Sequence, residues 1–244
     1  MILYSDKDDH YSHRVRIVLA EKDIACEIRE TSNDEAPEEV LSINPYHSLP
    51  ILIDRDLGLY NTSVMMEYLD ERFPHPPLLP VYPVTRANSR SLMLRINREI
   101  CPLLDNVILG KGNAKRIKED KENLLHEISS LAPTFREYPF FMNDEFSLTD
   151  CYLVPILWRL PSLGINLPLT KNIKPLLDYQ EKIFDRPGGD PISEQKKQRV
   201  EELASKNLEK VIDLEVERRK KALKTDDVDR EKVKAEITPQ YSSS

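Results

Sequence analysis

The sequence predicts an α/β domain that is followed by an all-helical domain and a charged tail. Short apolar runs alternate with helical segments over residues 1–75, and this alternation is typical of an α/β domain. Longer segments with apolar residues at helical spacing fill residues 86–184, which predicts a helical domain. Residues 189–244 hold 13 basic and 13 acidic residues and almost no aromatic ones, so they form a charged tail.

The first domain is expected to have the element order β-α-β-α-β-β-α. The strands are expected at Met1–Tyr4, Ala25–Arg29, Leu49–Ile53 and Leu59–Tyr60, and the helices at Tyr11–Glu21, Asn33–Leu41 and Val64–Glu71. Ser12 is expected to cap the first helix, and Asn61 or Thr62 the third. Because Pro50 opens the third strand, the order matches the thioredoxin-like arrangement, and a cis bond before Pro50 is expected.

A proline-dense segment separates the two domains. It contains Pro74, His75, Pro76, Pro77, Pro80 and Pro83. Proline fixes φ and lacks an N–H, so this segment is expected to be a stiff, extended connector rather than a helix or a central strand. Its composition fits two interpretations equally well, a linker that packs the domains together and a surface that contacts another protein.

The second domain is expected to contain four helices. They are predicted at Arg86–Ile108, Ala114–Arg136, Phe146–Leu160 and Ile173–Phe184. Ser147 and Asp150 have the spacing of a capping box, so we expect them to have a structural role at the start of the third of these helices. Pro155 is expected to kink that helix.

Composition limits the classes of function. The chain has 244 residues, a net charge of −7 and a sequence pI of about 5.4, which argues against general binding to nucleic acid or to anionic membranes. Cys26, Cys101 and Cys151 lie far apart and form no CxxC motif, so reduced thiols in a cytoplasmic protein are expected. No apolar run approaches 18 residues, so no transmembrane helix is expected.

The charged tail keeps apolar residues at helical spacing between Val200 and Ile212. It is interpreted as one exposed helix that frays toward its end, or as a disordered segment. Two further interpretations are open, a sequence that does not belong to the natural protein and a helix that binds a partner through the apolar stripe.

Four segments carry a resemblance to the glutathione-transferase superfamily and, within it, to the bacterial stringent starvation protein A branch. They are YSHRVRIVLAEK (11–22), NPYHSLPILIDRDL (44–57), MEYLDERFPHPPLLPVYPVTR (66–86) and DEFSLTDCYLVPILWRLPSLGI (144–165). The resemblance implies a thioredoxin-like domain over residues 1–76, a proline-rich connector over 77–84 and an all-helical domain over 85–187. Residues 188–244 fall outside it.

The resemblance also implies a function. The branch resembles transcription regulators that bind RNA polymerase holding the housekeeping sigma factor and alter promoter use in starvation or stress. Its Pro-His-Pro surface patch maps onto Pro74, His75 and Pro76, and we add Pro77 and Tyr82 to the expected partner-binding set. A homodimer is implied, and a heterodimer with a sister chain is the alternative. No sequence-specific nucleic-acid contact and no membrane contact are expected.

The positions that would support glutathione chemistry are changed. In cysteine-bearing relatives the nucleophile would align near Asp9, and a carboxylate there raises rather than lowers the pKa of a neighbouring thiol. Asn61 and Thr62 replace the acidic-Ser pair that holds the γ-glutamyl end of glutathione. The remaining pocket residues, Ser12, Leu49 and Pro50, are therefore interpreted as vestigial.

Other donors and ligands give weak signals. Tyr4, Ser5, Tyr11 and Ser12 remain as possible thiolate-stabilising groups, but core packing, turn formation and helix capping are the favoured interpretations of this set. His10 and His13 lack a third ligand, so no metal is expected, and no cofactor-binding motif is present. The sequence therefore predicts a non-catalytic regulator, with a glutathione-dependent transferase or reductase as the alternative.

Overall fold

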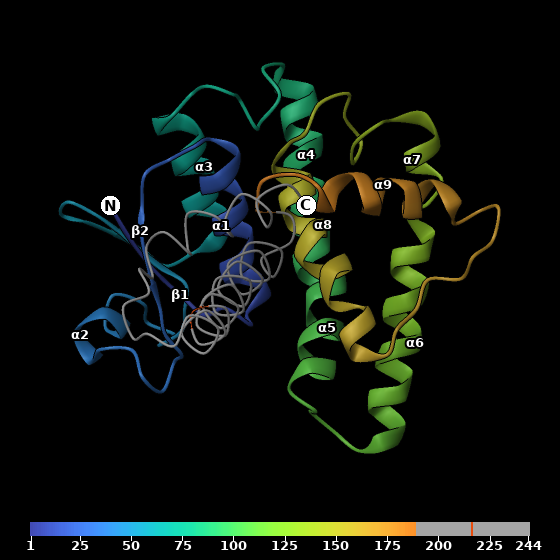
Figure 1. The fold of residues 1–244 in the computed structure, drawn as a ribbon, viewed down its shortest axis with the longest axis horizontal. Helices are drawn as coiled ribbons and strands as arrows, with labels where there is room; N and C mark the ends of the chain where they lie inside the picture. The colour runs from blue at the N-terminus through green and yellow to red at the C-terminus, as the bar shows by residue number, and fades with distance from the viewer. Residues whose placement is uncertain (189–215, 217–244) are drawn as a thin grey trace. The chain divides into compact units, whose positions relative to one another are not determined.

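The computed structural model describes residues 1–188 and Val216. The first half forms a four-stranded sheet with the order β2-β1-β3-β4, in which β1 pairs in parallel with β2 and antiparallel with β3 (Figure 1). The strands are β1 Ile2–Ser5, β2 Glu27–Glu30, β3 Ile51–Asp54 and β4 Leu57–Leu59. The fold therefore has the thioredoxin-like sheet that the sequence predicts.

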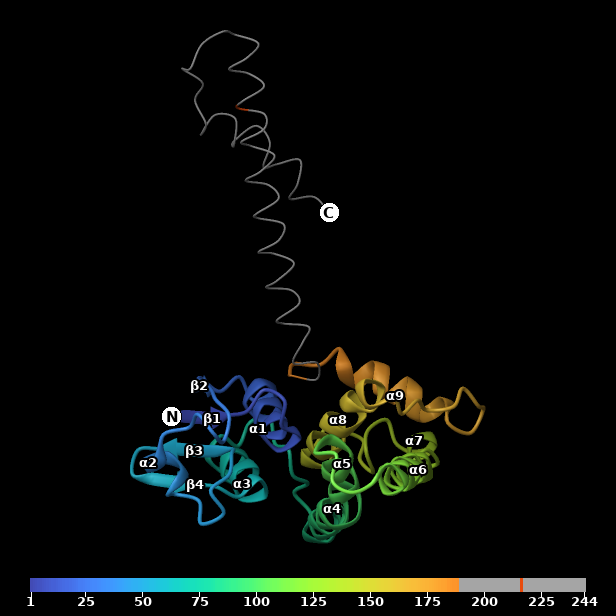
Figure 2. The ribbon, with the colours of Figure 1, turned by 90° about the horizontal axis from the view of Figure 1, so that it is seen from below.

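Alternation along the strands gives the sheet two apolar faces. Leu3 on β1 is paired with Leu52 on β3, and both belong to the main hydrophobic core. Their neighbours Tyr4 and Ile51 point to the opposite face, where they form a smaller cluster with Val40. Figure 2 shows the helices that cover these faces, with α1 and α3 on one side and α2 on the other.

Two of the expected helix starts in this half are corrected. Helix α1 spans His10–Glu21, and its N-cap is Asp9 rather than Ser12. Helix α2 is only Glu38–Leu41, because Pro37 is its extended N-cap and the helix does not reach back to Asn33.

The β3–β4 hairpin and helix α3 complete this half. The hairpin turn consists of Arg55 and Asp56, so β4 begins two residues before the predicted strand at Leu59. Helix α3 spans Thr62–Arg72 and is capped by Asn61, one of the two residues that the sequence predicts for this cap.

The first long helix of the second half has a π-helical turn within it. Helix α4 spans Pro83–Arg95, η1 spans Ile96–Ile100 with π-helical bonding, and α5 spans Cys101–Ile108. Pro102 has no N–H to donate to the turn before it, and the N–H of Cys101 reaches the carbonyl of Ile96. The single helix predicted from Arg86 is therefore divided, and it begins within the expected connector, at Pro83.

The remaining helices form the rest of the second half. They are α6 Ala114–Ser130, α7 Thr134–Glu137, α8 Leu148–Arg159, the 3-10 turn η2 Pro161–Leu163 and α9 Lys174–Phe184. The helix predicted over Ala114–Arg136 ends early because the chain turns before Pro133. Helix α8 begins with the capping box of Ser147 and Asp150.

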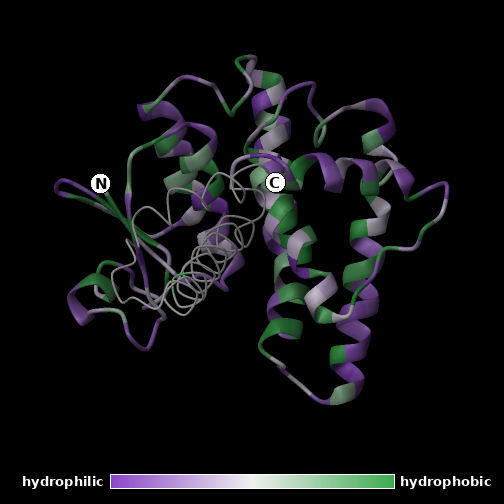
Figure 3. Ribbon diagram, in the orientation of Figure 1, coloured by the Kyte–Doolittle hydropathy of each residue, from purple (hydrophilic) through white to green (hydrophobic). Residues whose placement is uncertain are grey.

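One hydrophobic core runs through both halves, from Leu3 on β1 to Ile183 on α9. Helix α1 packs against both α3 and α8, so it joins the sheet to the helical half. Figure 3 shows that α6 is mostly hydrophilic along its length, whereas α8 carries a long hydrophobic stretch, and nearly every α8 residue is buried.

Two further sequence predictions concern membrane-spanning helices and the charged tail. In the part that the structure describes, no helix is long and apolar enough to cross a membrane. The apolar stripe predicted between Val200 and Ile212 lies outside the described residues.

Candidate functional site

The segment Phe73–Tyr82, called here the proline loop, joins α3 to α4 and contains no helix or strand. Pro74, His75, Pro76 and Pro77 are all exposed, and the His75–Pro76 peptide bond is cis. Tyr82 is 77% exposed and is the N-cap residue of α4. The structure therefore places all five expected partner-binding residues on the surface of one short segment.

The exposed part of this surface is apolar and extends beyond the residues that the sequence predicted. Val81 and Val84 are 74% and 75% exposed, and they flank Tyr82. No Asp, Glu, Lys or Arg occurs from Phe73 to Thr85, although 32% of the whole chain is charged. His75 is thus the one ionisable side chain apart from Tyr82 on this stretch. Isolated exposed apolar residues are normal, but a contiguous group is typical of an interaction surface.

The underside of the proline loop is anchored to the core. Leu78 and Leu79 are buried, and the backbone N–H of Leu148 at the start of α8 donates to the carbonyl of Leu78 at 2.8 Å. Arg86 on α4 donates to the carbonyls of Pro80 and Val81 at 2.9 and 3.3 Å. The loop therefore packs the two halves together and presents a surface at the same time, so both interpretations of the proline segment describe part of it.

Two buried charges that the sequence analysis did not single out also hold the loop. The Nζ of Lys22, at the end of α1, donates to the carbonyls of Phe73 and Pro76, each at 2.6 Å. The carboxylate of Asp70 on α3 accepts the N–H groups of Leu78 and Leu79 at 2.8 and 3.1 Å. Lys22 lies within a segment that carries the family resemblance, but its partners are too distant in sequence for a local pattern to reveal them.

Asp9, which the resemblance aligns near a nucleophile position, is the N-cap of α1. Its two carboxylate oxygens accept the N–H groups of Tyr11 and Ser12 at 3.1 and 2.6 Å. The Ser12 hydroxyl is buried and accepts the N–H of Asp6 at 3.1 Å. As an anion, Asp9 would raise the pKa of a neighbouring thiol, whereas the Ser12 hydroxyl accepts within the loop before α1 and keeps its own proton as a donor.

The backbone N–H next to the cis proline is also hydrogen-bonded within the protein. The Leu49–Pro50 bond is cis, as predicted, and both residues are buried. The N–H of Leu49 is not free to pair with a peptide-like ligand. That N–H donates to the side chain of Asn33 at 2.9 Å. Asn61 accepts the N–H of Val64 at 3.2 Å as the α3 cap, while Thr62 is the first residue of that helix.

The hydroxyl groups that remained as candidates for thiolate stabilisation have protein partners. Tyr4 accepts from Arg29 at 2.7 Å, and Ser5 accepts from Arg16 at 3.0 Å. The Tyr11 hydroxyl donates to Asp105 on α5 at 3.1 Å, and burial is the main reason that the pKa of Tyr11 is raised. Because a hydroxyl that donates to a carboxylate does not offer that proton to a thiolate, Tyr11 is poorly arranged for this chemistry.

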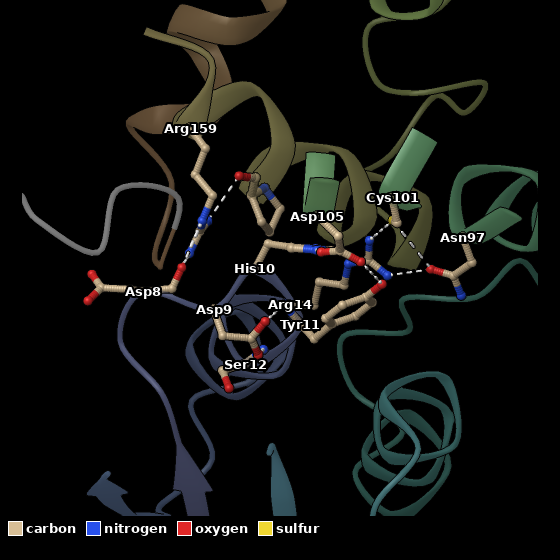
Figure 4. Close-up of polar contacts among 11 residues, drawn as sticks. Asp8, Asp9, His10, Tyr11, Ser12, Arg14, Asn97, Cys101, Asp105 and Arg159 are labelled. Carbon is tan, nitrogen blue, oxygen red and sulfur yellow. Dashed lines mark hydrogen bonds and ion pairs between the residues drawn. The ribbon is translucent and has the colours of Figure 1, made fainter. Parts of the chain in front are cut away.

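Figure 4 shows a polar cluster that joins α1 to the helical half. His10 contacts Asp105 at 2.8 Å. The buried Arg14 guanidinium donates to Asn97 at 2.7 Å and to the Cys101 sulfur at 2.9 Å. Burial raises the pKa of Cys101 despite the nearby arginine, so the thiol form is favoured. This cluster therefore has the character of a packed domain contact rather than an activated nucleophile.

The two histidines considered as metal ligands are both engaged elsewhere. His10 contacts Asp105, while His13 accepts from Arg159 at 3.2 Å and donates to the Gly188 carbonyl at 2.9 Å. Within the described residues, no group of three or more His, Cys, Asp or Glu side chains is placed to hold a metal ion.

Family models match most of the described chain. Residues 3–77 match the glutathione S-transferase N-terminal domain, and residues 89–187 match the glutathione S-transferase C-terminal domain. Solved structures show the same fold. Glutathione transferase Omega 3C from Trametes versicolor has a TM-score of 0.66 at 23% identity, covering 77% of this chain and 86% of that one. Gtt2 from Saccharomyces cerevisiae has a TM-score of 0.68 at 20% identity, covering 78% and 98%. The fold is therefore that of a glutathione S-transferase.

Proteins that are similar in sequence identify a smaller family within this superfamily. The stringent starvation protein A homolog of Coxiella burnetii is 47% identical over 186 residues, which cover 76% of this chain and 88% of that protein. The homolog of Haemophilus influenzae is 47% identical over 188 residues, covering 76% and 86%. A glutathione S-transferase 3 of Glycine max is 29% identical over 146 residues, covering 59% and 66%. The chain belongs to the stringent starvation protein A family within the glutathione S-transferase superfamily.

Proposed function

We propose that this protein is a non-catalytic regulator of transcription that binds RNA polymerase holoenzyme through the proline loop. In this proposal the holoenzyme carries the housekeeping sigma factor, and binding alters promoter use during starvation or stress. The main support is the surface of Pro74, His75, Pro76, Pro77 and Tyr82, which contains no Asp, Glu, Lys or Arg and is exposed while its backbone is held from below. Prolines lose little entropy on binding, so such a loop suits protein recognition.

The residues that correspond to the glutathione pocket form hydrogen bonds within the protein, and this supports a function in binding rather than in catalysis. Asp9 caps α1, Asn61 caps α3, and the N–H of Leu49 is bonded to Asn33. A bound glutathione would have to displace contacts that the protein already makes with itself. We therefore assign no catalytic residue, cofactor or metal to the function.

A homodimer is part of the proposal. Tyr46, Tyr60 and Val64 on the sheet half and Leu94 on α4 are exposed apolar side chains, and the rings of Tyr46 and Tyr60 contact each other. Exposed apolar groups of this kind favour burial against a second chain. A heterodimer with a sister chain would use the same surface, and sedimentation of the isolated protein against a mixture distinguishes the two assemblies.

The proposed compartment is the cytoplasm, and no membrane or sequence-specific nucleic-acid contact is part of the function. The cysteines at positions 26, 101 and 151 are free thiols, which suits a reducing environment. The net charge of −7 disfavours direct binding to nucleic acid.

The test is a binding assay with purified RNA polymerase holoenzyme and the full chain. His75→Ala combined with Pro76→Ala is expected to weaken binding about tenfold or more, because contacts at the centre of an interface dominate its energy. His126→Ala changes an exposed histidine on α6 and is the matched control, which is expected to bind as the wild type does. Equal binding by the double variant and the control would show that the loop is not the contact surface.

The alternative function is a glutathione-dependent transferase or reductase. The observation in its favour is that the cis Leu49–Pro50 junction is retained. Retention on glutathione resin together with a thiol-conjugation assay tests it. Clear turnover with a common electrophile would replace our proposal with the enzymatic one.

A further inference from the structure

A buried ion pair lies directly beneath the proline loop. The Nζ of Lys22 is 2.7 Å from a carboxylate oxygen of Asp70, and the Lys22 side chain is fully buried. An ammonium group has three N–H donors. In Lys22 these meet Asp70 and the carbonyls of Phe73 and Pro76, so the hydrogen-bonding capacity of the ammonium group is filled.

Asp70 completes the arrangement from the other side. One carboxylate oxygen accepts from Lys22 and from the N–H of Leu78, and the other accepts from the N–H of Leu79. The pair therefore fixes four backbone groups of one loop, two carbonyls and two N–H groups. A buried charge pair of this kind is favourable only when its remaining hydrogen bonds are made, and here the loop backbone makes them.

The two carbonyls that Lys22 binds belong to the residues on either side of Pro74 and His75. Those two side chains are exposed, whereas the groups that hold their backbone are buried. The geometry thus separates the contact surface, which faces outward, from the groups that determine its shape.

We propose that Lys22 and Asp70 are positioning residues that preorganise the proline loop for its partner. This inference rests on the proposed function of the loop. Neither side chain touches the partner, and both act by holding Pro74, His75 and the following residues in the conformation that binds. A loop that is already ordered loses less conformational entropy on association, so its affinity is higher than that of the same residues in a mobile loop.

The chemistry of the surface also defines the kind of partner that it fits. Pro74, Pro77, Val81, Tyr82 and Val84 are exposed and uncharged. The complementary surface is an apolar protein face, because a charged face would lose its water without gaining an opposite charge. On the holoenzyme, the contact is therefore an apolar surface rather than an acidic or basic one.

The test replaces the ion pair by apolar residues of similar size. Lys22→Met with Asp70→Leu removes both charges together, a change that is often close to neutral for stability, and it removes the four contacts to the loop. The matched control is Arg90→Met with Glu67→Leu, which removes a more exposed pair between α4 and α3 whose hydrogen bonds, within the described residues, join these two side chains and not the loop. Lys22→Gln together with Asp70→Asn is a second variant in case the apolar pair unfolds, because it also removes both charges and keeps polar groups at both positions.

Two measurements are made on the full-length proteins. Amide exchange of Leu78 and Leu79 reports on the loop, and titration with RNA polymerase holoenzyme reports on binding. The double variant is expected to exchange these amides faster and to bind about tenfold more weakly, whereas the control matches the wild type in both. In a background that already carries His75→Ala, the loss caused by the double variant is expected to be smaller, since both changes act on the same surface.

The outcomes separate the two proposals. Faster exchange with unchanged holoenzyme binding would overturn the positioning inference and leave the function standing. Unchanged exchange would overturn it directly, because the loop would not depend on the pair. If the wild type does not bind holoenzyme at all, the proposed function fails, and the inference that the loop is preorganised for this partner fails with it.

Discussion

At the scale of single residues, His13 joins three distant segments. Arg159 on α8 donates to its Nδ1 and also to the carbonyl of Asp8, before α1. Because arginine is only a donor, the Nδ1 atom of His13 must accept, and its Nε2–H donates to Gly188 after α9. The imidazole is therefore neutral, and burial, followed by the charge of Arg159, lowers its pKa from 6.5 to about 3.

This arrangement predicts a specific loss of stability in acid. The unfolded chain takes up a proton at His13 near pH 6.5 and the folded chain only near pH 3, so the unfolded state binds more protons between these values. The free energy of unfolding therefore falls as the pH falls through this window, by up to about 1.4 kcal/mol per pH unit from this group.

His13→Gln removes the titrating group and keeps a donor and an acceptor. Between about pH 6.5 and pH 4.5, urea unfolding of this variant is expected to show a pH dependence that is smaller by about 2 kcal/mol than that of the wild type. His126→Gln, on the exposed surface of α6, is the control. Parallel curves for His13→Gln and the wild type would show that His13 is not held neutral.

At the scale of elements, α8 depends on one buried carboxylate. Asp150 accepts the N–H of Ser147 at 2.9 Å, the N–H of Phe141 at 2.9 Å and the hydroxyl of Tyr179 at 2.8 Å. It thus caps the helix and also fixes the preceding loop and α9. Because α8 contacts α1, α4 and α9, the position of this helix affects the whole core.

Asp150→Ala is expected to lower the free energy of unfolding by about 3 to 5 kcal/mol, because it leaves buried donors without acceptors. Asn113→Ala removes the cap of α6, where Asn113 accepts the N–H of Arg116 on the surface, and is expected to cost about 1 kcal/mol. Chemical denaturation measures both. Similar losses for the two variants would contradict the central position given to Asp150.

These elements also show how far the sequence could predict the structure. The capping box of Ser147 and Asp150 and a cap at Asn61 or Thr62 follow from local residue chemistry, and the structure has the capping box and the cap at Asn61. The cis bond before Pro50 follows from the place of this residue in the thioredoxin-like order, and it also occurs. The prediction of Ser12 as the cap of α1 was wrong, because Asp9 and Ser12 are both good caps and the choice depends on where the helix starts. Pro102 is a local signal for the interruption between α4 and α5, because it has no N–H to donate to the preceding turn.

The candidate site was predictable in part, for a physical reason. Pro74 and His75 belong to a proline-rich segment that can form neither a helix nor a central strand, so an extended connector is expected there. The contacts of Lys22 with Phe73 and Pro76 join residues that are about 50 positions apart, and they exist only after α1 packs beside α3. No local pattern contains this information.

At the scale of the whole molecule, the glutathione S-transferase fold is retained while its pocket groups bond to the protein itself. Asp9 and Asn61 cap helices, and the N–H of Leu49 is bonded to Asn33. The same packing of α1 against α3 that places Lys22 also holds the proline loop outward. In the function that we propose, the fold serves as a scaffold for a contact surface on the proline loop.

Site-specific photo-crosslinking to RNA polymerase holoenzyme tests this claim most directly. A photoreactive amino acid is placed at His75 in the full chain, and at His126 on α6 as the control. We expect a strong crosslink from position 75 to a polymerase or sigma subunit, reduced by competition with unlabelled wild-type protein, and little or none from position 126. Equal labelling from both positions, or none from position 75, would contradict the proline loop as the surface through which this protein works.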